Sequence, residues 1–182
     1  PTLGFAKPKD KKDVRKKKWI RYERKHRLTA AHLDWGYDEK EERWFLPVID
    51  DASRKLLALV ECESATTDAS IDAVKESLKH GEIQQVITDH GTQFCKGMDD
   101  EAKFPAFLEK HGIQHILCKI KHPQNNGKAE KFMHLYLIHR NKFKTKEEFI
   151  FWYNKVRPHM SLNQETLETP KMAYQRKKIG NI

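Results

Sequence analysis

The sequence predicts an α/β protein in which a five-stranded mixed sheet is flanked by helices. The order of the predicted elements is the first observation: three β-type segments are followed by alternating helices and strands, and the chain ends in helices. The second is the composition of the 182 residues, 38% hydrophobic and 34% charged, which suits one domain with its own core. The third is that each of two predicted strands ends in an aspartate, at the strand ends where ligands collect in open α/β sheets.

The strand segments are short apolar runs bounded by turn residues. The first ends at Asp34 and the fourth ends at Asp89. Residues 51–54 separate the second segment from the third, and this short polar spacing predicts a hairpin. The five predicted strands are 28–35, 43–50, 55–63, 86–88 and 113–117.

Residues with known preferences for helix ends mark the helices. Thr67 or Asp68 suits the N-cap of the first helix, and Gly81 suits its end. Between them, apolar residues recur at three- and four-residue spacing, which indicates one buried face. Further helices are predicted over 105–111, 128–140, 146–156 and 170–176.

The net charge of +9 is distributed unevenly along the chain. Residues 1–27 have a net charge of +9, residues 28–120 of −8, and residues 121–182 of +8. An acidic centre between basic ends suits a metal-binding core flanked by phosphate-binding surfaces. Residues 1–18 read as a basic flexible linker, for which DNA contact and simple solvation are equally good interpretations.

Composition and cysteine usage exclude several classes of protein. No segment approaches the ~20 apolar residues of a membrane-spanning helix, and no apolar run follows the basic N-terminal region as it would in a signal peptide. Cys62, Cys95 and Cys118 form no Cys-x-x-Cys pair, which argues against a disulfide framework and against a zinc knuckle. A reducing, cytoplasmic setting is therefore expected, with Cys118 as a buried strand residue.

Three acidic residues lie in distinctive local frames: Asp34 in RLTAAHLDWGY, Asp89 in QVITDHGTQF and Glu130 in KHPQNNGKAEKF. Two carboxylates at strand ends and one on a helix match the needs of a two-metal phosphoryl-transfer site. Magnesium prefers oxygen ligands and keeps several waters, so a few carboxylates suffice. Alone, Asp34 suits a turn cap and Glu130 a solvated helix, whereas together the three residues favour metal ligation.

The segment TDHGTQF followed by HPQNNGKAEKF resembles the catalytic core of DDE-type integrases and transposases, which have a ribonuclease-H-like fold. The resemblance covers about Trp19 to Tyr174 and is nearest to prokaryotic insertion-sequence transposases, whose core is related to that of retroviral integrases. It implies an integrase catalytic core over residues 19–178. It also implies that Asp34, Asp89 and Glu130 are catalytic and bind two Mg²⁺ or Mn²⁺ ions.

Residues around Glu130 are candidates for DNA binding. The resemblance places the preceding loop against the substrate, and amide side chains can hold phosphate or sugar oxygens, although turn chemistry explains the same residues equally well. Two lysines beside Glu130 suit contacts with the DNA backbone or a solvated surface. The candidates are Gln124, Asn125, Asn126, Lys128 and Lys131.

The chain departs from the family pattern in places. Ala31 stands where relatives often carry a tryptophan. The 40 residues between Asp89 and Glu130 are more than usual, which predicts a polar surface insertion at 95–104. The adjacent aspartates of the predicted hairpin, Asp50 and Asp51, fit a family frame in which they shape the turn, so a structural role is expected.

The resemblance implies metal-dependent DNA strand cleavage and strand transfer, as in DNA integration, transposition and recombination by a mobile element. The expected partners are element ends and target DNA, bound by a homo-oligomer near the nucleoid, without a membrane. Because the chain begins at Pro1, without the helix-turn-helix region that usually precedes the core, a truncated product is expected. Two alternatives stay open: a silent or repurposed remnant that binds DNA or a partner transposase, and a nuclease of the same fold.

Overall fold

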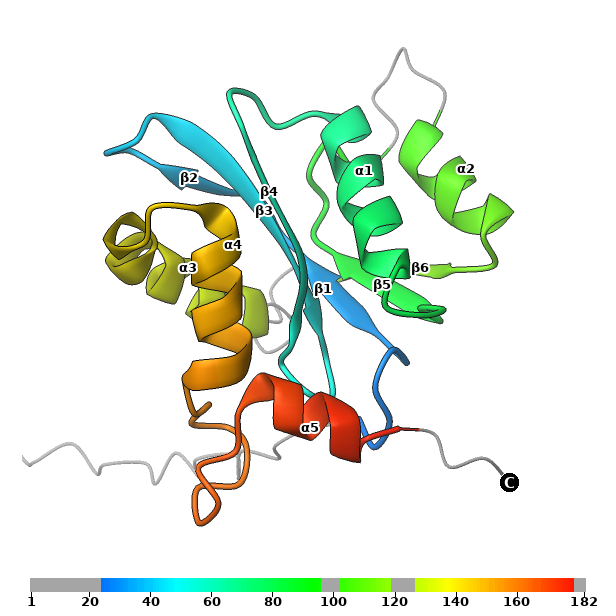
Figure 1. Cartoon of the computed structure of the whole chain (residues 1–182). Coiled ribbons are helices and arrows are strands. Elements are labelled where there is room, and N and C mark those ends of the chain that lie inside the picture. The colour runs from blue at the N-terminus through cyan, green and yellow to red at the C-terminus, as the bar shows by residue number, and fades with distance from the viewer. Residues whose placement is uncertain (1–23, 96–101, 119–126, 179–182) are drawn as a thin grey trace, which may run out of the picture.

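The computed structural model describes residues 24–95, 102–118 and 127–178. These residues form one mixed sheet with helices on both faces (Figure 1). This arrangement confirms the α/β class predicted from the order of the elements. The predicted linker over residues 1–18 lies outside the described residues.

The sheet has six strands, one more than predicted. The long hairpin of β3 and β4 is antiparallel, and β1 and β2 both pair antiparallel with β3. On the other side of β1, β5 and then β6 are parallel. The strands are β1 Ala31–Leu33, β2 Gly36–Asp38, β3 Arg43–Asp50, β4 Leu56–Cys62, β5 Gln85–Thr88 and β6 Gln114–Leu117.

The sixth strand, β2, follows the predicted strand 28–35, of which the structure keeps only Ala31–Leu33 as β1. From the first residue of β1 to the last residue of β2, pairing with β3 follows one register. That register places Asp34 opposite Pro47, which has no N–H to donate to a ladder. Pairing stops at residues 34–35 and resumes in β2, a strand that the sequence did not predict.

Helices cover both faces of the sheet. On one face lie α1, Thr67–Leu78, and α2, Lys103–Lys110. On the other lie α3, Gly127–His139, and α4, Lys146–Phe151, which continues as a π-helix through Trp152–Val156. A fifth helix, α5, Pro170–Arg176, lies at the hairpin end of the sheet (Figure 1). The N-cap of α1 is Thr66, one residue before the predicted candidates.

Alternate residues of β3 supply two separate cores. Leu46 and Val48 belong to the core under α1 and α2, whereas Phe45 and Ile49 belong to the core under α3 and α4. The ring of Tyr136 from α3 stacks on Phe45 with 3.9 Å between ring centroids. Helix α3, which carries Glu130, is thus packed on the hairpin face of the sheet.

Candidate active site

Asp34 lies at the end of β1, in the break opposite Pro47. Its neighbours Leu33 and Trp35 both pack in the core under α1, and Trp35 Nε1 donates a hydrogen bond of 3.1 Å to Ser70 Oγ on that helix. Because side chains alternate along an extended chain, the half-buried carboxylate of Asp34 projects toward the side of α3.

Asp89 lies at the equivalent position of the neighbouring parallel strand. In the register of β1 and β5, Ala31 lies beside Val86, and continuing it by three residues brings Asp34 beside Asp89. Both aspartates therefore lie at the carboxyl ends of adjacent parallel strands, as predicted from the sequence.

The carboxylate of Asp89 is fixed by the turn that follows it. The backbone N–H of Gly91 donates to Asp89 Oδ1 over 2.9 Å. A Cβ atom added at Gly91 would lie 3.0 Å from that oxygen and 2.9 Å from Gln93 Oε1. The absence of a side chain at residue 91 thus lets the backbone approach the carboxylate and orient it.

Cys118 lies directly after β6, the next parallel strand beside β5, as Asp89 lies directly after β5. Its backbone N–H donates to the carbonyl oxygen of Thr88 over 2.8 Å, and its side chain is buried, as expected. Burial raises the pKa of the Cys118 thiol, and the negative charges of Asp34 and Asp89 raise it further. Sequence reasoning gave Cys118 no place at the site, although its position directly after a strand was a usable signal.

Glu130 lies in the first turn of α3 and is exposed. Its neighbours on the helix, Ala129 and Phe132, face the sheet and are buried. Among the residues that the structure describes, no three His, Cys, Asp or Glu side chains form a group that could hold a metal ion. The pairing of β1 with β5 thus sets Asp34 beside Asp89, while Asp34, Asp89 and Glu130 do not form a three-member group of this kind in the described structure.

The predicted DNA contacts fall into two sets. Gln124, Asn125 and Asn126 lie outside the described residues. Lys131 is exposed on α3, whereas the ammonium of Lys128 forms an ion pair with a buried aspartate of the β3–β4 hairpin.

The two hairpin aspartates have different surroundings. The carboxylate of Asp50 is fully buried and accepts hydrogen bonds from the backbone of Leu28 at 2.7 Å and of Ser53 at 2.8 Å, so the expected structural role is confirmed. Asp51 is the partner of Lys128, and it also accepts from His32 Nε2 at 2.5 Å. Sequence reasoning missed these two contacts of Asp51, because no local pattern joins residues so far apart.

Both members of the Asp51–His32 pair have shifted pKa values. Burial raises the pKa of Asp51, but the hydrogen bond from His32 and the positive charge of Lys128 outweigh burial and hold the pKa below its ordinary value. Burial lowers the pKa of His32, more than Asp51 raises it. Among the residues that the structure describes, none offers a hydrogen-bond partner to the buried Nδ1 atom of His32, as suits a neutral ring that donates through Nε2.

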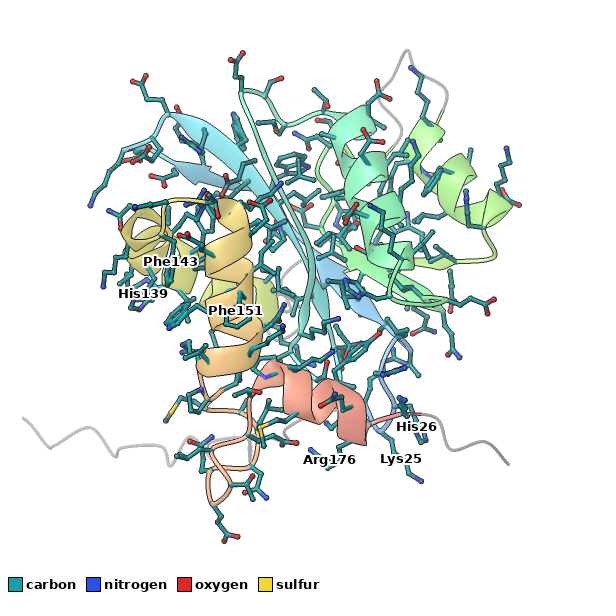
Figure 2. All side chains as sticks on the ribbon, in the orientation of Figure 1. Lys25, His26, His139, Phe143, Phe151 and Arg176 are labelled. Atoms are coloured by element: carbon teal, nitrogen blue, oxygen red, sulfur yellow. The ribbon has the colours of Figure 1, made fainter. Side chains whose placement is uncertain are left out.

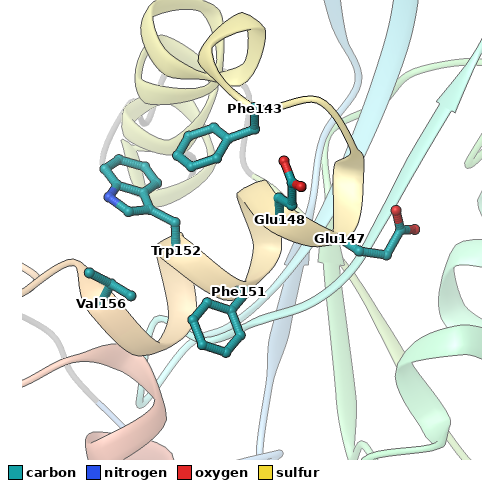
Figure 3. A pocket seen from close by; sticks show the side chains of 6 residues that line it. All are labelled: Phe143, Glu147, Glu148, Phe151, Trp152 and Val156. Carbon is teal, nitrogen blue, oxygen red and sulfur yellow. The ribbon is translucent and has the colours of Figure 1, made fainter.

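A shallow apolar hollow lies on α4 and the π-helix that continues it (Figure 3). Its rim contains Glu147 and Glu148, and its apolar lining comes from Phe143, Phe151, Trp152 and Val156. Phe143 and Phe151 lie on the side of the molecule away from α1 and α2 (Figure 2). None of the predicted site residues lines this hollow.

A mixed sheet with aspartates at adjacent parallel strand ends is an arrangement shared in fold with integrase catalytic cores. The HTLV-2 integrase catalytic core domain, solved in complex with magnesium in a trimeric form, superposes with a TM-score of 0.65 at 14% identity, over 82% of this chain and 97% of that chain. The catalytic core domain of BIV integrase gives a TM-score of 0.58 at 13% identity, over 82% of this chain and 95% of that chain. These likenesses confirm the ribonuclease-H-like fold.

Residues 25–123 match the family described as the integrase core domain, and the chain belongs to this family. A putative integrase, ORF3, of Spiroplasma virus SpV1-C74 is 26% identical over 190 residues, which cover 89% of this chain and 52% of the relative. An uncharacterized protein of Archaeoglobus fulgidus is 25% identical over 97 residues, which cover 53% of this chain and 78% of that protein. The chain thus spans about half the length of the viral relative. No helix in the described part is long and apolar enough to cross a membrane.

Proposed function

We propose that this chain is the catalytic core of a transposase or integrase that cuts DNA strands and transfers their ends. The observation that carries the proposal is the position of Asp34 and Asp89 at the carboxyl ends of adjacent parallel strands. Family membership supplies the reaction class. The substrates would be the ends of a mobile element and target DNA, bound by a homo-oligomer.

Two divalent ions, Mg²⁺ or Mn²⁺, are proposed at Asp34, Asp89 and Glu130. The donor set fits hard cations, because carboxylate oxygens are their preferred protein ligands. When bound, the two metal ions would activate the attacking water or 3′-hydroxyl and stabilise the leaving oxygen. Asp34 and Asp89 would supply the fixed part of the site, since Gly91 already orients the Asp89 carboxylate. Glu130 would complete the set from the first turn of α3.

DNA would lie across the side of α3 from which Glu130 projects. Lys131 is exposed there and suits a phosphate contact, which would add affinity without sequence preference. Gln124, Asn125 and Asn126 precede α3 in the sequence and are proposed to hold phosphate or sugar oxygens of the same strand. Lys128 is kept as a fifth candidate, in competition with its ion pair to Asp51.

Thermal unfolding with metal tests the site. Because a ligand that binds only the folded state stabilises it, metal at 100 times its Kd should add about 2.7 kcal/mol and raise Tm by several degrees. Asp89→Asn should abolish this rise, since an amide keeps the shape but loses the charge. Glu82→Gln, at an exposed residue outside the site, is the matched control and should leave the rise unchanged. An undiminished rise in Asp89→Asn would remove Asp89 from the metal site.

A strand-joining assay tests the reaction. Given a pre-cut DNA end with a free 3′-hydroxyl, and Mn²⁺, the chain should join that end to a second duplex, and Glu130→Gln should eliminate the products. Cutting without joining would favour a nuclease of the same fold. Binding of DNA without any product would favour a silent remnant.

A further inference from the structure

Helix α3 is held against the sheet at its C-terminal end by a carboxylate of the hairpin. Glu61 on β4 accepts hydrogen bonds from Arg140 Nε at 2.6 Å and from the Tyr136 hydroxyl at 2.9 Å. Burial raises the pKa of Glu61, but the hydrogen bonds from Arg140 and Tyr136 outweigh burial and hold the pKa below its ordinary value. Glu61 therefore stays charged, and the end of α3 is anchored to β4.

A second hairpin carboxylate holds the N-terminal end of the same helix. Asp51, directly after β3, is 1% exposed and forms an ion pair with Lys128 in the first turn of α3. The Lys128 side chain is itself only 20% exposed. Removing one partner of a buried ion pair is strongly destabilising, because the other charge is left without compensation. The first turn of α3 therefore cannot lift from the hairpin without a large loss of stability.

Asp51 also connects this turn to the strand that carries Asp34. Its Oδ1 accepts from Nε2 of His32, which lies in β1 two residues before Asp34. On the helix, Glu130 lies two residues after Lys128. The contacts from His32 through Asp51 to Lys128 thus connect β1, which precedes Asp34, with α3, which carries Glu130. Asp51 and Lys128 are 77 residues apart in the sequence.

We propose that Asp51 is a positioning residue: through Lys128 it sets the first turn of α3 against the sheet, and thereby sets where Glu130 stands relative to Asp34 and Asp89. This inference rests on the proposed function, because the proposed function is what assigns Glu130 to the metal site. It assigns the Lys128 ammonium to Asp51 and not to DNA phosphate.

Two variants break the contact from its two sides. Lys128→Met and Asp51→Asn should each lower strand joining from a pre-cut end at least tenfold and raise the Mn²⁺ concentration needed for half-maximal joining. Affinity for DNA should change less than twofold in both. Lys128→Arg keeps a positive charge at residue 128 and should restore most of the joining. Lys75→Met removes a lysine from the exposed Lys75–Asp72 pair and should behave like the unmodified chain.

Amide hydrogen exchange gives a test that does not depend on activity. Residues 129–132 should exchange at least ten times faster in Lys128→Met and in Asp51→Asn, and at the original rate in Lys75→Met. Unchanged exchange would overturn the inference even if the unmodified chain joins no DNA, so failure of the proposed function is distinguishable. Loss of DNA affinity in Lys128→Met but not in Asp51→Asn would also overturn it, since Lys128 would then be a DNA contact. If Asp51→Asn does not fold, Lys128→Met and Lys128→Arg carry the test.

Discussion

At the scale of single residues, Lys55 is a cation buried at the hairpin end of the sheet. Its Nζ donates to His80 Nδ1 at 3.0 Å and lies 4.2 Å from the centre of the Tyr174 ring. Burial lowers the pKa of Lys55 to about 8, and the positive charges of Lys171 and Arg27 add to the effect. The ordinary value in the unfolded chain is 10.5.

Lys55 should therefore give stability an alkaline pH dependence. Below pH 8 the folded chain holds a charge that burial disfavours, and between pH 8 and 10.5 the unfolded chain binds more protons, so folding gains stability as pH rises. Lys55→Met should raise Tm at pH 7, and the difference from the unmodified chain should shrink toward pH 10.5. Thermal unfolding across this range measures it, with the exposed Lys75→Met as the control. A difference in Tm that is independent of pH would contradict the prediction.

The thiol of Cys118 reports whether Asp34 and Asp89 share one site. Both carboxylates raise its pKa, so Asp34→Asn and Asp89→Asn should each lower it. The ultraviolet absorbance of the thiolate during a pH titration measures this in a background with Cys62 and Cys95 replaced by serine. Glu82→Gln should leave the titration unchanged. If only one of the two aspartate variants shifts the titration of the Cys118 thiol, then the two carboxylates do not share one site beside that thiol.

At the scale of elements, the short strand β2 contacts α3 through the ring of Phe45 in β3. Gly36, its first residue, lies against the fully buried ring of Phe45, and a Cβ there would come within 2.3 Å of the ring. The ring cannot retreat, because Tyr136 of α3 stacks on it. The glycine therefore lets β2, β3 and α3 pack together.

Gly36→Ala should lower the free energy of unfolding by about 1–3 kcal/mol, the usual cost of overpacking a core. Gly127→Ala is the matched control, because a Cβ at residue 127 meets no atom of the described residues within 4 Å. Urea unfolding of both variants measures the difference. Equal stabilities would mean that the Phe45 ring can move and that α3 is not fixed by this contact.

At the scale of the whole molecule, the charge of the chain is arranged in three blocks. Residues 28–120 have a net charge of −8, and the segments before and after them are both strongly positive. The two proposed aspartate ligands belong to the acidic block, and the lysines of α3 belong to the second basic block. A chain with this arrangement should bind DNA chiefly through phosphate neutralisation.

Binding to duplex DNA should therefore weaken steeply with salt, because each neutralised phosphate releases a counterion. Removing residues 1–18 should flatten the plot of log affinity against log salt if this basic segment contacts DNA. Titrations of both chains at several salt concentrations measure the two slopes. Parallel plots would show that the segment adds solubility and no contacts.

Much of the fold was predictable because its signals are local. The ends of β3 and the bounds of α5 agree with the predicted segments 43–50 and 170–176. Turn residues at 51–54 marked the hairpin, which the pairing of β3 with β4 confirms. The extra strand β2 was not predicted, since its pairing depends on the register that β1 and β2 share along β3.

The sequence by itself determined the fold class, the family and the two aspartates at strand ends, because strand periodicity and the frames around Asp34 and Asp89 involve neighbouring residues only. Tertiary structure alone decided how distant groups meet. The pairing of β1 with β5 brings Asp34 beside Asp89, and the packing of α3 on the hairpin brings Lys128 to Asp51. Such contacts follow from burial and strand register across the whole chain, and no local sequence pattern encodes them.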